Sequence, residues 1–139
     1  MFIQLTNTVS VAPQLDPAQL ADAAAQGFTA VVNNRPDGEA SDQPSDEAMR
    51  AAAAAAGLRY ASIPIDQSGF DMTQIDAMVD VLEAGGRVLA FCRSGTRSTN
   101  LWALAEAKRG GDPDAIVAAA ARGRYDVSGL LPTMRKLAP

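Results

Sequence analysis

Short apolar runs alternate with helix-forming stretches along the chain, and no other feature constrains its fold as strongly. The runs that we expect to form strands are residues 2–5, 8–12, 28–32, 58–65 and 88–91. The stretches that we expect to form helices are residues 16–27, 45–56, 71–84, 98–108, 112–121 and 128–137. When strands and helices alternate, each helix returns the chain to the same end of the sheet, so the strands are parallel. The sequence therefore predicts an α/β fold with a mostly parallel central sheet and helices on both faces.

Local signals support these boundaries. Asp16-Pro17 has the pattern of a helix start, in which an Asp cap precedes Pro at the first helical position. Asp71 and Gln74 have the spacing of a capping box. Pro64 lacks an N–H, which indicates an edge strand or a bend near the end of the run 58–65. The chain is long enough for one sizeable core, and we expect residues 1–139 to form a single domain.

Composition excludes several classes of site. The chain has no histidine, so Cys-His catalysis, Ser-His catalysis and histidine-ligated metal sites are impossible. A single cysteine can form neither an internal disulfide nor a CxxC metal site, which fits a reducing compartment. The net charge of −4 argues against general binding of nucleic acid. The chain has no signal-peptide pattern and no apolar run of membrane-spanning length, so we expect a cytoplasmic protein without membrane contact, metal or cofactor.

Cys92, the only cysteine, follows the apolar run Val88-Leu89-Ala90-Phe91 and opens the segment Cys92-Arg93-Ser94-Gly95-Thr96-Arg97-Ser98. A strand, a tight loop and a helix in this order place the sulfur at the floor of a small cup. We expect the backbone N–H groups of residues 93–97 and a helix N-terminus to line this cup, and both bind anions. A thiolate in such a cup is a strong nucleophile. The alternative is a buried cysteine at the end of a strand.

The polar residues after the cysteine fit an oxyanion site. Arg97 carries a permanent charge and can hold two oxygens of a phosphate in a planar fork. The alternative for Arg97 is an ion pair with an acid elsewhere in the chain. The other candidates for substrate binding are Arg93, Ser94, Gly95, Thr96 and Ser98, although Ser98 could simply cap the next helix. Residues 87–139 carry nine basic and four acidic side chains, against three and twelve in residues 1–86, so the cup lies in the positive part of the chain.

Displacement of an alkoxide from phosphorus needs a proton donor, and without histidine this donor must be Asp or Glu. Asp66 is the first candidate, because it ends a strand at the same sheet edge as Cys92 and leads into a flexible Gln-Ser-Gly loop. Asp71 is the second, although its capping-box spacing favours a structural role. Arg35 reaches the same edge, where it could contact substrate or, as we expect, pair with a neighbouring acid. Trp102 is expected to lie in the core.

Segments spread over most of the chain match, in order, those of one known family. They are residues 9–15, Asn34-Arg35-Pro36-Asp37 with Glu39, residues 57–65, and Cys92 to Ser98 followed by Leu101-Trp102. The chain resembles the beta-lactamase-hydrolase-like, phosphatase-like family, a small bacterial branch related to dual-specificity tyrosine phosphatases. The resemblance implies a phosphatase-like α/β fold in which Cys92 is the nucleophile, Arg97 the anion clamp and Asp66 the acid.

The loop departs from the tyrosine-phosphatase pattern, because four residues instead of five separate Cys92 from Arg97, and Phe91 stands where those enzymes usually have histidine. It is instead similar to the active loop of rhodaneses, which carry sulfur as a cysteine persulfide. Two activities therefore stay open. We favour hydrolysis of phosphate esters through a phosphocysteine, and the alternative is sulfur transfer through a Cys92 persulfide. A non-enzymatic anion-binding or redox-sensing module is the weakest interpretation. The expected partner is a small anionic or phosphorylated molecule, and the sequence indicates no oligomeric state.

Overall fold

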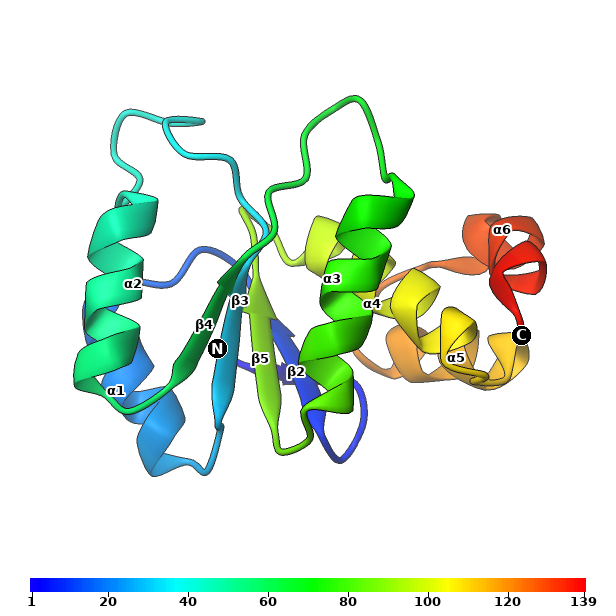
Figure 1. Ribbon diagram of the computed structural model, residues 1–139, viewed down its shortest axis with the longest axis horizontal. Coiled ribbons are helices and arrows are strands. Elements are labelled where there is room, and N and C mark those ends of the chain that lie inside the picture. Colours follow the sequence, from blue (N-terminus) through cyan, green and yellow to red (C-terminus); the bar gives the residue numbers. More distant parts are fainter.

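Five strands form one sheet in the computed structural model, which describes all of residues 1–139 (Figure 1). The strands are β1 (Ile3–Gln4), β2 (Val9–Ala12), β3 (Ala30–Asn33), β4 (Arg59–Ser62) and β5 (Val88–Phe91). Their order is β1-β2-β5-β3-β4, and every neighbouring pair is parallel except β1 and β2. This confirms the predicted mostly parallel sheet, and it makes β5, the strand that leads into Cys92, the central one.

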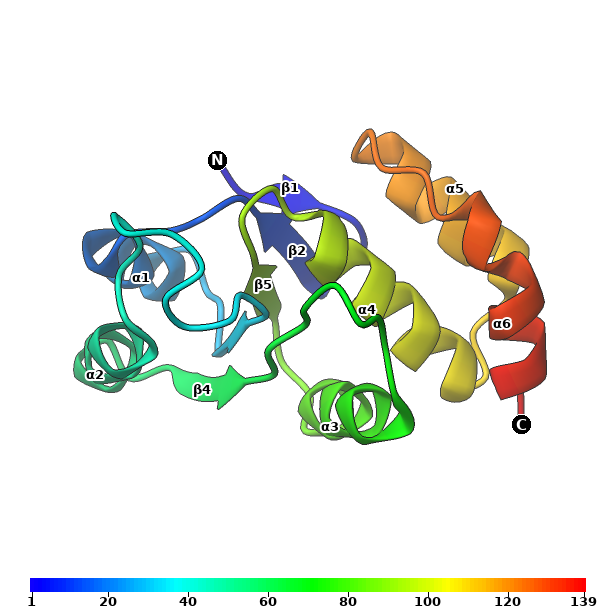
Figure 2. The ribbon, with the colours of Figure 1, turned by 90° about the horizontal axis from the view of Figure 1, so that it is seen from above.

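Helices cover both faces of the sheet, as predicted (Figure 2). One face carries α1 (Pro17–Ala25) and α2 (Asp46–Ala55), and the other carries α3 (Met72–Glu83) and α4 (Thr96–Lys108). The C-terminal elements, which pack against α4, are α5 (Pro113–Arg122), the 3-10 helix η1 (Ser128–Leu130) and α6 (Leu131–Leu137). No helix is long and apolar enough to cross a membrane.

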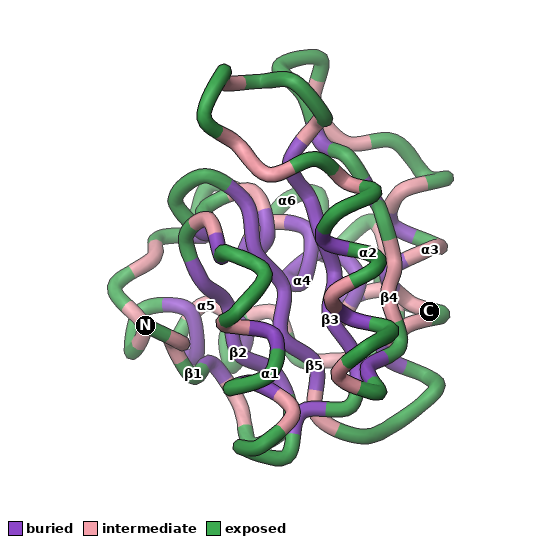
Figure 3. Tube along the Cα trace, turned by 90° about the vertical axis from the view of Figure 1, so that its left-hand side faces the viewer, coloured by how far each residue is buried: buried purple, intermediate pink, exposed green.

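The central strand divides its side chains between two apolar cores, because successive residues of a strand point to opposite faces. Leu89 and Phe91 pack into the core beneath α1 and α2, and Val88 and Ala90 into the larger core beneath α3 and α4. All four are buried, whereas the loops at the ends of the sheet are largely exposed (Figure 3). Burial of a side chain of the size of Phe91 stabilises the fold by about 1.5–3 kcal/mol. The residue directly before Cys92 is therefore firmly anchored.

Helix α4 lies between the sheet and the C-terminal helices, and this position explains its composition. Eight of its residues are buried, and alanine at several of them lets the neighbouring elements approach closely. Trp102 is 1% exposed, which confirms its predicted place in the core. Because α4 is held on both sides, its first turn is a rigid support for the loop that precedes it.

Several predicted boundaries were wrong, and one of them matters for the site. The strand expected from Phe28 begins at Ala30, and the helix expected over 128–137 is η1 followed by α6. The strand expected over 58–65 ends at Ser62, because Pro64 has no N–H to continue the pairing, and β4 lies at the sheet edge as that proline indicated. The helix expected from Ser98 begins at Thr96. Arg97 therefore lies in the first turn of α4 and not in the loop. The predicted capping boxes at Asp16 and Asp71 are both present.

Candidate active site

The carboxyl ends of the four parallel strands meet at one edge of the sheet, which is the upper edge in Figure 1. The segments that leave this edge are residues 13–16 after β2, 34–45 after β3, 63–71 after β4 and 92–95 after β5. In open parallel sheets this edge is where ligands bind. Cys92, Arg97 and Asp66, the first candidates for catalysis, all lie at this edge.

Cys92 lies directly after the central strand, and its side chain has no exposed surface. Its Sγ accepts a hydrogen bond of 3.1 Å from the backbone N–H of Gly95. Gly95 is the N-cap residue of α4 and has a φ of 88°, a left-handed conformation that glycine adopts without a steric penalty. Gly95 has no side chain that could cap this helix, and the N–H of Thr96 donates to Oγ of Ser94 at 3.4 Å. The N–H group of Gly95 is the only one of the five expected N–H groups that donates to the sulfur.

The hydroxyl groups near the loop have different surroundings. The hydroxyls of Ser94 and Thr96 lie 3.0 Å apart at the exposed rim. The Ser98 hydroxyl donates instead to Oδ1 of the buried Asn34, at 2.8 Å. Arg93 lies within the loop and is exposed. The roles of these residues in substrate binding stay predictions.

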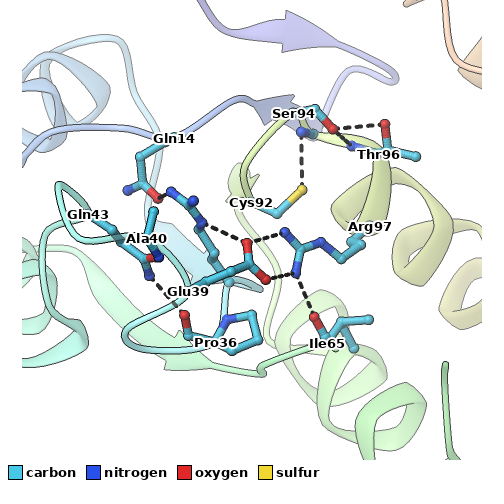
Figure 4. Close-up of polar contacts among 12 residues, drawn as sticks. Gln14, Pro36, Glu39, Ala40, Gln43, Ile65, Cys92, Ser94, Thr96 and Arg97 are labelled. Atoms are coloured by element: carbon cyan, nitrogen blue, oxygen red, sulfur yellow. Dashed lines mark hydrogen bonds and ion pairs between the residues drawn. The ribbon is translucent and has the colours of Figure 1, made fainter. Parts of the chain in front are cut away.

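Arg97 is held by acceptors on two other loops (Figure 4). Its Nη1 donates to Oε2 of Glu39 and to the backbone oxygen of Ile65, each at 2.8 Å. Its Nη2 donates to Oε1 of Glu39, also at 2.8 Å. A guanidinium has five N–H donors. Nε–H and one Nη2–H therefore donate to no protein oxygen, and they lie side by side in the geometry that binds two oxygens of one anion.

Electrostatics support a link between Arg97 and the cysteine. The pKa of Arg97 is raised by its hydrogen bond to Glu39, against the opposing effect of burial, and by attraction to the charge of a Cys92 thiolate. The cation thus lies close enough to stabilise negative charge at the sulfur.

Glu39 is the acceptor that joins the two arginines of the site. Besides its two bonds with Arg97, its Oε1 accepts from Nε of Arg35 at 2.9 Å, and Nη1 of Arg35 donates to Gln14. This confirms the predicted ion pair of Arg35 with a neighbouring acid. Hydrogen bonds from Arg97 and Arg35 lower the pKa of Glu39 to about 2, although partial burial opposes the change. Glu39 therefore stays ionised at any physiological pH.

Asp66 lines the same cavity as Arg97. The cavity has a volume of about 570 Å³, and its lining residues are Glu39, Asp66, Gln67, Arg93 and Arg97. The hydroxyl and the backbone N–H of Ser68 both donate to Oδ1 of Asp66 and lower its pKa. In this conformation Asp66 is an exposed carboxylate. Asp71 is not part of the cavity, and its carboxylate caps α3 by accepting from the N–H of Gln74.

A family model with the description "Beta-lactamase hydrolase-like protein, phosphatase-like domain" matches residues 1–109. The chain belongs to this family. A beta-lactamase hydrolase-like protein of Agrobacterium fabrum is 37% identical to the phosphatase-like domain over 111 residues, which are 78% of this chain. One from Xylella fastidiosa strain Temecula1 is 32% identical over 106 residues, or 76% of the chain. The chain spans about a quarter of the length of these relatives, because the matches cover 25% of each.

Solved structures share the fold of this phosphatase-like domain. A candidate phosphatase from Neisseria meningitidis has a TM-score of 0.77 at 24% identity, with 97% of both chains covered. A kinase-associated phosphatase, solved with serine in place of its catalytic cysteine, has a TM-score of 0.72 at 14% identity, with 97% of this chain and 92% of the other covered. At these identities the likeness shows the fold alone, and it confirms the expected phosphatase-like α/β architecture.

Sequence reasoning missed two residues that organise the site of this domain. Glu39 was part of the family resemblance but had no assigned role, although its spacing of four from Arg35 is that of an ion pair. Asn34 is fully buried, donates to the backbone oxygen of Ile63 and accepts from Ser98, so it ties the ends of β3 and β4 to α4. The sequence did carry a signal for Asn34, because it is a polar residue directly after a buried strand. No group of three or more Cys, Asp or Glu side chains is arranged to hold a metal ion.

Proposed function

We propose that this domain is a cysteine-dependent hydrolase of phosphate esters, with a small phosphorylated molecule as its substrate. The observation that carries the proposal is how the Arg97 guanidinium is held and which of its donors remain available. Glu39 and Ile65 hold its guanidinium beside the cysteine loop, and two parallel N–H groups donate to no protein oxygen. A phosphoryl group has the charge and the oxygen spacing that such a pair of donors binds.

In the first step of the proposed reaction, the Cys92 thiolate attacks phosphorus. An S–P bond forms while the ester P–O bond breaks, and the departing oxygen takes a proton from Asp66. Arg97 and the N–H groups of the loop would stabilise the negative charge on the phosphoryl oxygens in the transition state.

In the second step, water attacks the phosphocysteine. The S–P bond breaks, the Asp66 carboxylate accepts a proton from the water, and the thiolate and inorganic phosphate result. For the first step Asp66 must carry a proton, which its hydrogen bonds with Ser68 oppose in this conformation. We therefore expect the loop after β4 to move on substrate binding, so that Asp66 leaves Ser68 and approaches the ester oxygen.

Sulfur transfer is the second candidate, and the complete burial of Cys92 favours it. A narrow cup with only four residues between Cys92 and Arg97 suits a single sulfur atom better than a tetrahedral phosphoryl group. In this reaction the S–S bond of thiosulfate breaks, sulfite leaves, and the resulting persulfide gives its outer sulfur to cyanide or a thiol. Sulfite is a stable anion, so no proton donor is needed.

The test compares p-nitrophenyl phosphate, an alkyl phosphate, and thiosulfate with cyanide on the same protein. Asp66→Asn should lose about 10²–10⁴-fold in rate on the alkyl phosphate, the usual range for general acid catalysis, and much less on p-nitrophenyl phosphate. Thiosulfate turnover should stay within a few-fold of wild type. Asp71→Asn is the matched control, because asparagine caps a helix as well as aspartate does.

Each outcome decides between the candidates. If the Asp66 variant is neutral on every phosphate ester and the protein transfers sulfur, the phosphatase proposal is wrong. If Asp71→Asn removes the phosphatase activity and Asp66→Asn does not, the reaction stands and the assigned acid is wrong. If the protein binds oxyanions but turns over none of these substrates, neither enzymatic candidate is correct, and the protein is a non-enzymatic anion-binding module.

A further inference from the structure

A side chain from outside the family-matched segment contacts the loop that holds Cys92. The hydroxyl of Tyr125 donates a hydrogen bond of 2.9 Å to the backbone oxygen of Ser94. Tyr125 lies between α5 and η1, beyond the residues 1–109 that match the family model. The C-terminal helices therefore supply a group to the wall of the site.

The end of α5 fixes the direction in which Tyr125 points. The N–H of Tyr125 donates to the backbone oxygen of Ala120, and the N–H of Arg124 to that of Ala121. These are the two hydrogen bonds of a Schellman motif. Arg124 has a φ of 70° and is the only residue other than glycine with a positive φ. A residue with a Cβ adopts this conformation rarely, so a defined turn, and not a loose loop, carries Tyr125 to Ser94.

The hydrogen bond to Ser94 acts on the cysteine through one peptide group. The Ser94 carbonyl and the Gly95 N–H belong to the same peptide unit, which is planar, so neither can rotate without the other. Tyr125 holds the carbonyl end, and the N–H end donates to Sγ of Cys92 at 3.1 Å. If this peptide turned over, the carbonyl oxygen would face the sulfur in place of the N–H. That arrangement would repel both a thiolate and a bound anion.

Packing at Gly95 shows how closely Tyr125 covers this peptide. A Cβ added at Gly95 would lie 2.3 Å from the Tyr125 hydroxyl oxygen. Glycine beside a peptide bond lowers the steric barrier to its reorientation, so an external contact is needed to keep one orientation. Burial raises the pKa of Tyr125, and the charge of Cys92 raises it further. The hydroxyl thus keeps its proton and remains a donor.

We propose that Tyr125 is a positioning residue of the active site, which holds the Ser94–Gly95 peptide with its N–H toward the Cys92 sulfur. The hydroxyl makes its hydrogen bond to the Ser94 carbonyl and not to the sulfur, so it acts through the peptide group. This proposal depends on the proposed function only where it predicts an effect of Tyr125 on turnover. The orientation of the Ser94–Gly95 peptide can be measured without a substrate.

The experiment compares Tyr125→Phe with Tyr60→Phe. Tyr60 is the other tyrosine of the chain, and its hydroxyl donates to Asp46, away from the loop. In Tyr125→Phe, we expect the Gly95 N–H to exchange with solvent deuterium about 3- to 10-fold faster, the range that one hydrogen bond of ordinary net strength supports. Cys92 alkylation by iodoacetamide at pH 7 should slow by about 3- to 10-fold, because the sulfur loses a hydrogen-bond donor. Tyr60→Phe should change neither quantity.

Unchanged exchange and alkylation in Tyr125→Phe would overturn the proposal, and so would equal changes in both variants. A nuclear Overhauser contact between the Tyr125 ring and the Gly95 α-protons of the wild type tests the placement without any variant, and its absence would also refute it. If the wild type turns over neither phosphate esters nor thiosulfate, the proposed function fails. The exchange and alkylation data would still decide the role of Tyr125.

Discussion

Substitution of Glu39 by glutamine tests how Arg97 is held. Glu39 accepts three hydrogen bonds from Arg97 and Arg35 at 2.8–2.9 Å. Glutamine has nearly the same shape, but it lacks the charge and turns an N–H₂ group toward one of the guanidinium donors. We expect lower stability at neutral pH and a poorly oriented Arg97.

The magnitude follows from the pKa of Glu39. The difference between the ordinary value of 4.5 and about 2 sets an upper limit of roughly 3 kcal/mol, at about 1.36 kcal/mol per pKa unit. Because the side chain is 29% exposed, solvent screening reduces the expected effect to about 1–2 kcal/mol. The carboxylate is favoured in the folded state, so this stability is present above pH 4.5 and is lost as the pH falls toward 2.

Urea unfolding followed by the fluorescence of Trp102, the only tryptophan, measures this effect at pH 7, 4 and 3. The wild type should be more stable than Glu39→Gln at pH 7, and the difference should narrow at the lower values. Glu83→Gln is the control, because Glu83 forms a single longer ion pair of 3.6 Å with Arg109 and is 60% exposed. It should change stability by about 0.5 kcal/mol or less.

The same variant decides what Glu39 does for the anion site. If Glu39 orients Arg97, glutamine should lower kcat/KM on a phosphate ester by about 10- to 100-fold. If glutamine instead tightens the binding of an oxyanion such as vanadate, the carboxylate competes with the substrate and our interpretation is wrong. A stability difference that stays constant from pH 7 to pH 3 would refute the electrostatic argument.

Three further predictions concern the nucleophile, the arginine and the core. Cys92→Ser should abolish turnover of every substrate, because the chain has no second cysteine and no histidine. The circular dichroism spectrum should stay that of a folded protein. Near-wild-type turnover would disprove the central role of Cys92. Arg97→Lys should weaken oxyanion binding by about 10-fold or more, because an ammonium cannot offer two parallel donors. Inhibition by vanadate measures this binding. Unchanged inhibition would mean that the anion binds elsewhere. Trp102→Phe should cost less than about 2 kcal/mol in urea unfolding followed by circular dichroism, because the cavity left by the smaller ring is partly offset by loss of a buried indole N–H that has no hydrogen-bond partner. A cost above about 4 kcal/mol would show that this N–H has a partner in solution.

The candidate site was predictable where it depends on neighbouring residues. An apolar run, a cysteine, a Ser-Gly-Thr turn and a helix-forming stretch lie within about twenty residues, and each of these elements follows from local propensity. Even there, the start of α4 was placed two residues late. Helix starts without a side-chain cap carry no clear signal, and this N-terminus has none.

The partners of the site were not predictable in this way. Asp66 could be assigned to the correct sheet edge from strand topology alone, because parallel strands end on the same side. Its hydrogen bonds with Ser68, which keep it ionised, depend on the conformation of a loop. A sequence pattern gives the residues of such a loop but not their directions.

The sequence by itself determined the α/β architecture and the strand, loop and helix around Cys92, because alternation of strands and helices admits few other arrangements. Only the tertiary structure decided what holds the loop and its arginine. Glu39 lies 58 residues from Arg97, and Tyr125 lies 31 residues from Ser94. Each contact forms only after the sheet and α4 bring two distant segments together. The free energy of such contacts depends on distance and burial, which no local pattern encodes.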